Sequence, residues 1–446
     1  MQLLGCTTVP DEPYHTICNG EPTCSDASLE AAVKVRRDVL IDRYGWNACL
    51  TDKYSHLRGR HVVVKATKCD EEQLTNNVPT PYAEAWMEYN IAGEAHDHWQ
   101  RDAILKWIQS GTGPVYVVIY IHGWHHNAST CDGDPYNNAI MFPMLMARQV
   151  DTLRRLEMSK QLSMPAVLGV YVGWSEEKYV HAGLPGLWSI GSRSEVADRI
   201  GQRVILKEDL LAIATAVRNR SGNDGHTLVI GHSLGGRMLT TMFNDELNHG
   251  ESQPLGPGSL IATINAAVGA DCFDGVLSDK GINPEGPRPT WMNVTSKNDT
   301  AAGWPYELAT TVCLVKSCNS QSEAHKKTVG HYSPYLKQVV DNARHLGDGP
   351  APITECGKKN PVSRADTAQI FELNWFHEPK TMLMAFPYRD NRALNERSTS
   401  CYSVHLSMEN KVPEAALKKT VWNIRSDESL IDRSVKGGGI DGHHNG

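Results

Sequence analysis

Residues 227–236 read TLVIGHSLGG, and this stretch decides the predicted fold. Its first four residues are typical of a short buried strand, and apolar residues recur at helical spacing after the last glycine. Gly231, Ser233 and Gly235 fill the fixed positions of a Gly-x-Ser-x-Gly turn between a strand and a helix. A side chain at either glycine would collide with the neighbouring strand and helix. The turn therefore lifts Ser233 above the carboxyl edge of a sheet, where a base can activate its hydroxyl.

The chain on both sides of this turn alternates short apolar strands with helices. This pattern is typical of a mostly parallel central sheet with helices on both faces, so the predicted fold class is α/β. The expected strands are residues 115–121, 166–172, 227–230, 260–265 and 291–295, and the expected intervening helices include 138–157 and 206–218.

The rest of the chain is expected to elaborate a single domain, residues 26–446. Residues 1–25 are expected to form a tether or disulfide-stapled arm, and residues 28–44 and 81–109 are expected to be helical. The segment 173–200 has no clear periodicity, and within it residues 176–194 are a candidate lid; an ordinary packed loop is the alternative. Residues 303–400 are expected to be a long insertion before a C-terminal histidine loop.

The composition is that of an ordinary globular protein. Of 446 residues, 40% are hydrophobic and 21% are charged, which argues against disorder, collagen and a coiled coil. The 44 basic and 51 acidic residues give a net charge of −7, so no cationic field attracts a nucleic acid. The longest apolar run, residues 115–121, is much shorter than the roughly 20 residues of a membrane-spanning helix.

The chain has eleven cysteines, which are many for a cytosolic enzyme, and none forms a Cys-x-x-Cys pair. Disulfides are therefore expected, with Cys18/Cys24 and Cys313/Cys318 as candidate pairs.

Residues 3–6, LLGC, resemble a bacterial lipobox, in which the cysteine carries a lipid. If Cys6 is set aside for lipid, ten cysteines remain for up to five bridges. This interpretation predicts a cell-envelope, periplasmic or secreted protein with a membrane tether at Cys6. The alternative is that Cys6 is an ordinary thiol.

The Gly-x-Ser-x-Gly turn in its strand and helix setting resembles the α/β-hydrolase superfamily, in particular its serine esterases and lipases. A second similarity lies at residues 121–124, IHGW, at the end of the expected strand 115–121. It resembles the His-Gly loop that supplies part of the family's oxyanion hole, and the longer run HGWHHNA resembles a bacterial subset of the family. The resemblance implies the α/β-hydrolase fold, most clearly over residues 110–300, with Ser233 as the nucleophile.

The resemblance also implies roles for the residues beside the nucleophile. The backbone N–H groups of Trp124 and Leu234 would bind the oxygen that becomes negative in the tetrahedral intermediate. His122, Gly123 and His232 would contact the substrate.

The histidines at 122, 125 and 126 raise the question of a metal site. The chain has no His-Glu-x-x-His pattern, so we expect these histidines to hydrogen-bond the backbone of their own loop. We expect no metal and no cofactor, because acyl transfer needs only positioned donors and a base.

The acid and the base of a catalytic triad follow the serine in chain order in this superfamily. Asp299, just after the expected strand 291–295, is the candidate acid, and Asp271 is the alternative. His444 is the preferred base because it follows a strand-like segment, 401–408, and a flexible triglycine, and because the ending IDGHHNG resembles that of the same bacterial subset. His331 and His443 remain alternatives.

These residues together predict a serine carboxylester hydrolase, an esterase or a lipase, that acts on a small-molecule or lipid ester through an acyl-enzyme on Ser233. Two alternatives stay open. One is an amidase, thioesterase or acyltransferase with the same site, and the other is a binding protein without turnover.

Overall fold

The structure is a computed structural model. It describes residues 61–62, 82–124, 126–128, 164–174, 185–249, 253–276, 290–296, 299, 306, 318, 323–332, 335, 340–345, 384–388, 402–408 and 420–426, and scattered positions between 138 and 153. The predicted arm 1–25, with Cys6, and the predicted helix 28–44 lie outside these residues.

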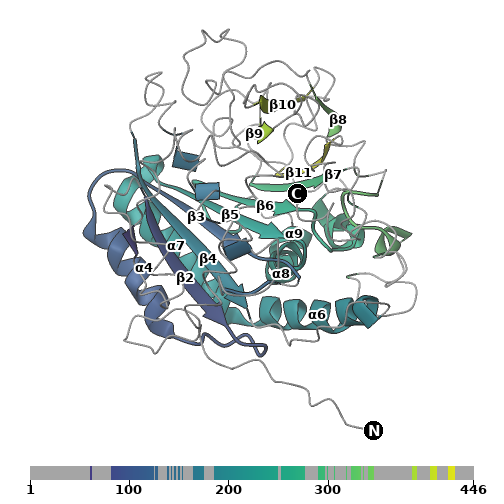
Figure 1. Ribbon diagram of the computed structural model, residues 1–446, viewed down its shortest axis with the longest axis horizontal. Helices are drawn as coiled ribbons and strands as arrows, with labels where there is room; N and C mark the ends of the chain where they lie inside the picture. The colour runs from purple at the N-terminus through teal and green to yellow at the C-terminus, as the bar shows by residue number, and fades with distance from the viewer. Residues whose placement is uncertain are drawn as a thin grey trace, which may run out of the picture.

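An 11-stranded sheet with the order β1-β2-β4-β3-β5-β6-β7-β11-β8-β10-β9 organises the fold (Figure 1). The strands are β1 (His61–Val62), β2 (Ala83–Tyr89), β3 (Val115–Ile121), β4 (Ala166–Trp174), β5 (His226–His232), β6 (Ser259–Ile264), β7 (Trp291–Ser296), β8 (Val340–His345), β9 (Met384–Tyr388), β10 (Tyr402–Met408) and β11 (Val421–Ser426). The main helices are α4 (His98–Ser110), α6 (Pro185–Gln202), α7 (Val204–Ser221), α8 (Leu234–Met242) and α9 (Asn244–His249).

In this sheet order, all neighbouring strands from β1 to β8 pair in parallel. Strand β10 pairs antiparallel with both of its neighbours, β8 and β9. The predicted mostly parallel sheet is therefore confirmed, as are the five expected strands, each within a few residues. Strand β3 has six buried residues out of seven, in the order VYVVIYI, because such β-branched and aromatic runs pack well when helices cover both faces.

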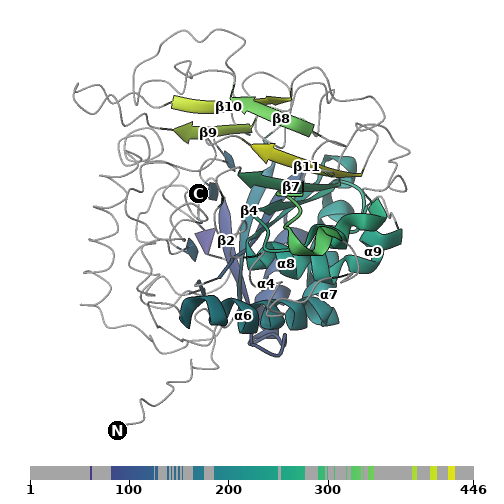
Figure 2. The same ribbon diagram turned by 90° about the vertical axis from the view of Figure 1, so that its right-hand side faces the viewer.

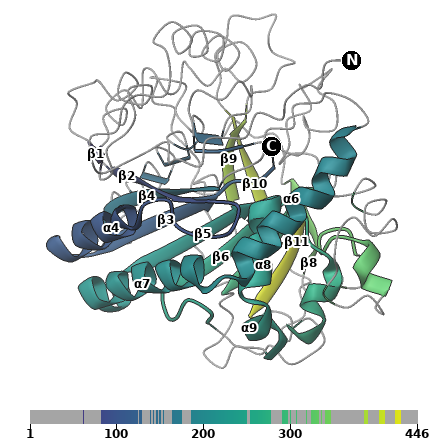
Figure 3. The ribbon, with the colours of Figure 1, turned by 90° about the horizontal axis from the view of Figure 1, so that it is seen from below.

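Helices cover both faces of the sheet. Tyr120 of β3 points to one face, where its ring lies 6.2 Å from the ring of Phe142 in the helical segment after β3. The next strand presents Gly231 to the opposite face, where a Cβ at that position would lie 2.7 Å from Leu239 of α8. Helices α4, α7 and α8 lie on this second side (Figure 3). No helix among the described residues is both long enough and apolar enough to cross a membrane.

The prediction of a helix over residues 81–109 was wrong in its first half. Residues 83–89, AEAWMEY, form strand β2, and only 98–110 form a helix. Alanine, glutamate and methionine favour helices, but β2 is buried on both faces, with Glu84 and Glu88 only 0% and 3% exposed. The glutamate at 88 accepts a hydrogen bond from Gln100 of α4, 3.2 Å away. Tertiary packing therefore decided the secondary structure here.

The segment 173–200 was expected to be irregular, but its described residues from 185 onwards are helical. Helix α6 begins at residue 185, inside the candidate lid 176–194, and packs against α8. Arg237 of α8 donates two hydrogen bonds to Asp198 of α6, at 2.8 and 2.7 Å. Residues 185–194 of the candidate lid thus belong to a helix that is anchored beside α8.

The insertion predicted at 303–400 adds strands β8 and β9 to the sheet. Together with β10, which lies just after the predicted insertion, they continue the sheet beyond β7 and β11 (Figure 2). Although 124 residues separate the end of β7 from the start of β11, the two strands pair in parallel register from Val421 and Trp291 to Ser426 and Ser296.

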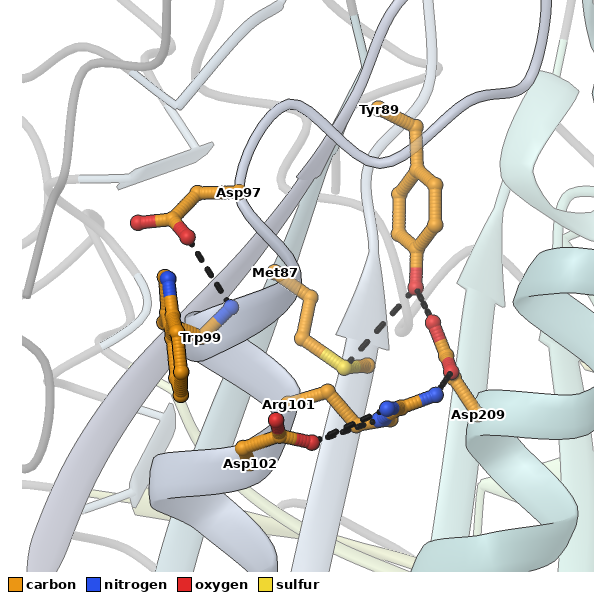
Figure 4. A network of polar contacts seen from close by, with 7 residues as sticks. All are labelled: Met87, Tyr89, Asp97, Trp99, Arg101, Asp102 and Asp209. Carbon is orange, nitrogen blue, oxygen red and sulfur yellow. Dashed lines mark hydrogen bonds and ion pairs between the residues drawn. The ribbon is translucent and has the colours of Figure 1, made fainter.

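A partly buried polar network joins β2, α4 and α7 (Figure 4). The Tyr89 hydroxyl donates to Asp209 at 2.7 Å, and Arg101 donates to the other carboxylate oxygen of Asp209 at 3.1 Å and to Asp102 at 2.9 Å. Burial raises the pKa of Asp209 even though both contacts favour the carboxylate. The network ties β2 to α4 and α7.

A disulfide joins Cys272 to Cys318. The predicted pair Cys313/Cys318 is therefore wrong, and Cys18/Cys24 lies outside the described residues. Proximity in sequence favoured Cys313, but the fold brings Cys318 beside the short helix η4 (Ala270–Phe273) across 46 residues of chain.

We expect loss of this disulfide to lower the free energy of unfolding by about 4 kcal/mol, the loop-closure entropy of a 46-residue loop. Chemical denaturation of Cys272→Ala, Cys318→Ala and the double variant would measure it. The double variant should be no less stable than either single variant, because each one already opens the loop. Additive losses would show that the two cysteines act separately.

Candidate active site

The chain reverses its direction of progress across the sheet between β3 and β5. From β3 it continues through a helix on one face to β4, and from β5 it continues through α8 on the other face to β6. In open α/β sheets the loops at such a point separate and leave a crevice at the carboxyl ends of the strands. The loop after β3 carries residues 122–124 and the turn after β5 carries Ser233, so the topology brings together the two motifs that the sequence singled out.

Ser233 occupies a strained turn between β5 and α8. Its φ is 52° and its ψ is −114°, a combination that costs energy for any residue with a Cβ. Both backbone polar groups are held: the N–H donates to Ile264 at 3.0 Å, and the carbonyl accepts from Arg237 and Ala267 at 3.2 and 3.1 Å. The serine is the N-cap of α8, but its side chain makes no capping hydrogen bond, so the hydroxyl is not committed to the helix.

Glycines allow this turn to fit, as the sequence predicted. A Cβ at Gly235 would run into the backbone carbonyl of Ile121 and lie 2.7 Å from that of His122, and one at Gly231 would lie 2.8 Å from the carbonyl oxygen of Gly235. These obstacles are backbone atoms and cannot rotate away. The first turn of α8 therefore packs directly on the loop after β3.

The same loop touches Ser233 itself. A Cβ at Gly123 would lie 2.8 Å from the Cβ of Ser233 and 3.0 Å from the carbonyl oxygen of His232. Ser233 is only 2% exposed, so its surroundings are largely shielded from water. Low polarisability there strengthens each hydrogen bond to a developing charge.

The His122 ring is fully buried and holds the loop. Its Nε2 accepts from the N–H of Trp174 at 3.0 Å, so the proton sits on Nδ1, which donates to the carbonyl of Gly123 at 2.8 Å. The ring stacks between Trp174 and Tyr171, with centroids 5.2 and 5.8 Å away. Burial lowers the pKa of His122 to about 4, so the ring is neutral at pH 7. Its expected hydrogen bonding to the backbone is confirmed, and with both nitrogens used in this way the ring offers none to a substrate.

The other residues expected around Ser233 lie close to it in the fold. Trp124 is partly buried against the core, and Leu234 opens α8, where the first amides of a helix lack partners within the helix. The positive end of the α8 dipole adds to their attraction for an anion. His232 is the last residue of β5 and is 5% exposed.

The two candidate acids occupy different surroundings. Asp299 is 2% exposed and lies three residues after the end of β7. Asp271 belongs to η4 after β6 and is 3% exposed. It sits beside Tyr306, whose pKa is raised by burial and, less strongly, by the negative charge of Asp271. The carboxylate at 271 thus lies among buried groups that include Arg237, which also faces Tyr306.

Of the three candidate bases, the structure describes one, His331. His331 lies in a turn after η6 (Glu323–Lys326), with its Nδ1 2.9 Å from the hydroxyl of Thr328. His443 and His444 lie outside the described residues. The chain that leads to them leaves β11 at Ser426, which is in register with Ser296 of β7. The C-terminal segment therefore starts from the same sheet edge as Asp299.

The strand-like segment 401–408 is confirmed as β10, which pairs antiparallel near the far edge of the sheet. The last strand before the histidines in the described part of the chain is β11, which the sequence did not predict. Its sequence, VWNIRS, is short and half polar, and no periodicity distinguishes it. The sequence signal for this strand was Trp422, a large apolar residue that the structure buries.

Within the described part of the chain, one group of side chains has the spacing of metal ligands: Asp271, Cys272 and Cys318. Both sulfurs are joined in the disulfide, so neither can act as a thiolate ligand.

Comparison of the chain with protein-family models, with curated proteins and with solved structures finds no match in any of the three.

Replacing Ser233 tests whether the backbone is strained at this position. We expect Ser233→Gly to be about 1 kcal/mol more stable than Ser233→Ala, because glycine adopts the observed φ and ψ freely while alanine keeps the strain. Urea denaturation measures the difference. The matched control is Ser194, a buried serine inside α6, where glycine should be the less stable variant by about 0.5–1 kcal/mol. The same order at both sites would argue against strain at Ser233.

The buried neutral His122 predicts a loss of stability in acid. Its folded pKa of about 4 lies below the ordinary value of 6.5, so its contribution is complete above pH 6.5 and disappears as the pH falls towards 4. The total is about 3 kcal/mol. Urea denaturation between pH 4 and 7 should show this dependence in wild type and a shallower one in His122→Asn, which does not titrate. Equal pH dependence would contradict a buried neutral ring.

Proposed function

We propose that this protein has the α/β-hydrolase fold and is a serine carboxylester hydrolase that acts through an acyl-enzyme on Ser233. One observation carries the proposal. The serine occupies a strained strand-to-helix turn at the carboxyl edge of a parallel sheet, and the glycine of the His-Gly loop lies directly against it. A protein that needed only a tight turn would place glycine at 233, where it relieves the strain. Strain kept at a position that bears a hydroxyl favours a chemical role.

In the proposed mechanism, the Ser233 hydroxyl attacks the ester carbonyl and passes its proton to His444, which Asp299 orients. The N–H groups of Trp124 and Leu234 hold the oxyanion, each contributing about 3–4 kcal/mol to stabilising the transition state. His444 then gives its proton to the leaving alcohol. Water, activated by the same histidine, attacks the acyl-enzyme and restores Ser233 with release of the carboxylic acid.

The choice of acid and base is supported by the strand order. Nucleophile, acid and base would follow β5, β7 and β11, and the carboxyl ends of these parallel strands all lie on one edge of the sheet. Asp299 follows β7 directly, and β11 is the neighbour of β7. This arrangement favours His443 or His444 over His331, whose Nδ1 is beside the Thr328 hydroxyl.

A fluorophosphonate probe and a series of p-nitrophenyl esters test the proposal. We expect one equivalent of label on wild type, none on Ser233→Ala, and a loss of about 10⁶-fold in kcat for Ser233→Ala and for the variant that removes the base. His444→Ala, His443→Ala and His331→Ala would identify that base, and Asp299→Asn should lower kcat with folding intact.

Ser259→Ala is the matched control, because Ser259 is also a buried serine but lies at the start of β6, at the opposite edge of the sheet. It should keep full labelling and turnover. Folded wild type that neither reacts with the probe nor hydrolyses any ester would contradict the proposal. Faster turnover of matched thioesters or anilides would replace the ester as the substrate class.

A further inference from the structure

Trp174, the last residue of β4, contacts the His-Gly loop in three ways. Its indole Nε1–H donates to the carbonyl of His122 at 3.1 Å, and its backbone N–H donates to Nε2 of the His122 ring at 3.0 Å. The two rings stack with an interplanar angle of 7°. Trp174 is 2% exposed and His122 is 0% exposed, so water does not compete for these bonds.

The His122 ring passes this contact on to the next peptide unit. Because Nε2 accepts a proton from Trp174, Nδ1 must be the protonated nitrogen, and it donates to the Gly123 carbonyl. The carbonyl of Gly123 and the N–H of Trp124 belong to one peptide unit, and the described residues contain no cis peptide. The two groups of a trans peptide point in opposite directions. Holding the carbonyl at the His122 ring therefore directs the Trp124 N–H to the other side.

We infer that Trp174 and His122 are positioning residues that orient the oxyanion hole, an inference that rests on the proposed function. Gly123 lies against Ser233, so the peptide that follows it begins beside the nucleophile. Fixing that peptide before the reaction removes the cost of turning its N–H towards the oxyanion as charge develops. The hydrogen bond to its carbonyl also polarises the amide and strengthens its N–H as a donor.

The key variant is Trp174→Phe, which keeps an aromatic ring on His122 and removes the indole N–H. We expect kcat to fall about tenfold with KM within about twofold, a smaller effect than the 10²–10³-fold loss when an oxyanion donor is deleted. The inhibition constant of an alkyl boronic acid, whose tetrahedral adduct places an oxygen in the hole, should rise by the same factor as kcat falls. A purely structural role would not change the inhibition constant and kcat by the same factor.

His122 is tested by two replacements. His122→Asn keeps an amide donor near the Nδ1 position and should retain more activity than His122→Phe, which removes both hydrogen bonds. The matched control is Trp291→Phe in β7, where the indole N–H donates to Asn293 at 2.9 Å in the core. It should lower stability and leave kcat and the boronic acid constant unchanged.

Two outcomes distinguish failure of the proposed function from failure of the positioning role. Absence of turnover by wild type would overturn the proposed function and this inference together. Turnover by wild type, with kcat and boronic acid affinity in Trp174→Phe no more affected than in Trp291→Phe, would overturn the positioning role alone.

Discussion

The close approach of two backbone segments, the first turn of α8 and the end of β3, is the constraint on which the site depends. The carbonyls of Ile121 and His122 lie so near Gly235 that no side chain fits between them. Strand β5 must therefore end beside β3, and the chain must turn at Ser233 within one residue. The turn has a positive φ, which the neighbouring hydrogen bonds to Ser233 enforce. The position of the hydroxyl is thus a consequence of backbone packing.

Burial then determines which groups near Ser233 carry a charge. His122 is neutral because burial lowers its pKa, and it contributes two directed hydrogen bonds in place of a charge. An ion pair joins Arg237 of α8 to Asp198, one turn beyond Ser233, and it anchors α6. Near the hydroxyl, backbone amides and the helix dipole are left to interact with a developing negative charge.

Long-range strand pairing assembles the rest of the site. Strands β7 and β11 are neighbours although the chain between them contributes β8, β9 and β10 to the outer part of the sheet. The pairing brings the segment that leads to the C-terminal histidines to the edge where Asp299 lies. An insertion of this kind lengthens the sheet without disturbing the packing of β3 against β5, because it is added on the far side of β7.

The sequence by itself determined the strands β3 to β7, the glycine turn at Ser233 and the His-Gly loop, because each leaves a local signal, either a short run of apolar residues or glycines at fixed spacing. Only the tertiary structure decided that the helix-favouring residues of β2 form a strand, that the polar segment VWNIRS is a central strand, and that Cys272 is the partner of Cys318. It also decided that Trp174 holds the loop from 52 residues away. These outcomes depend on which surfaces are buried against each other, and the local composition and spacing of residues do not specify that packing.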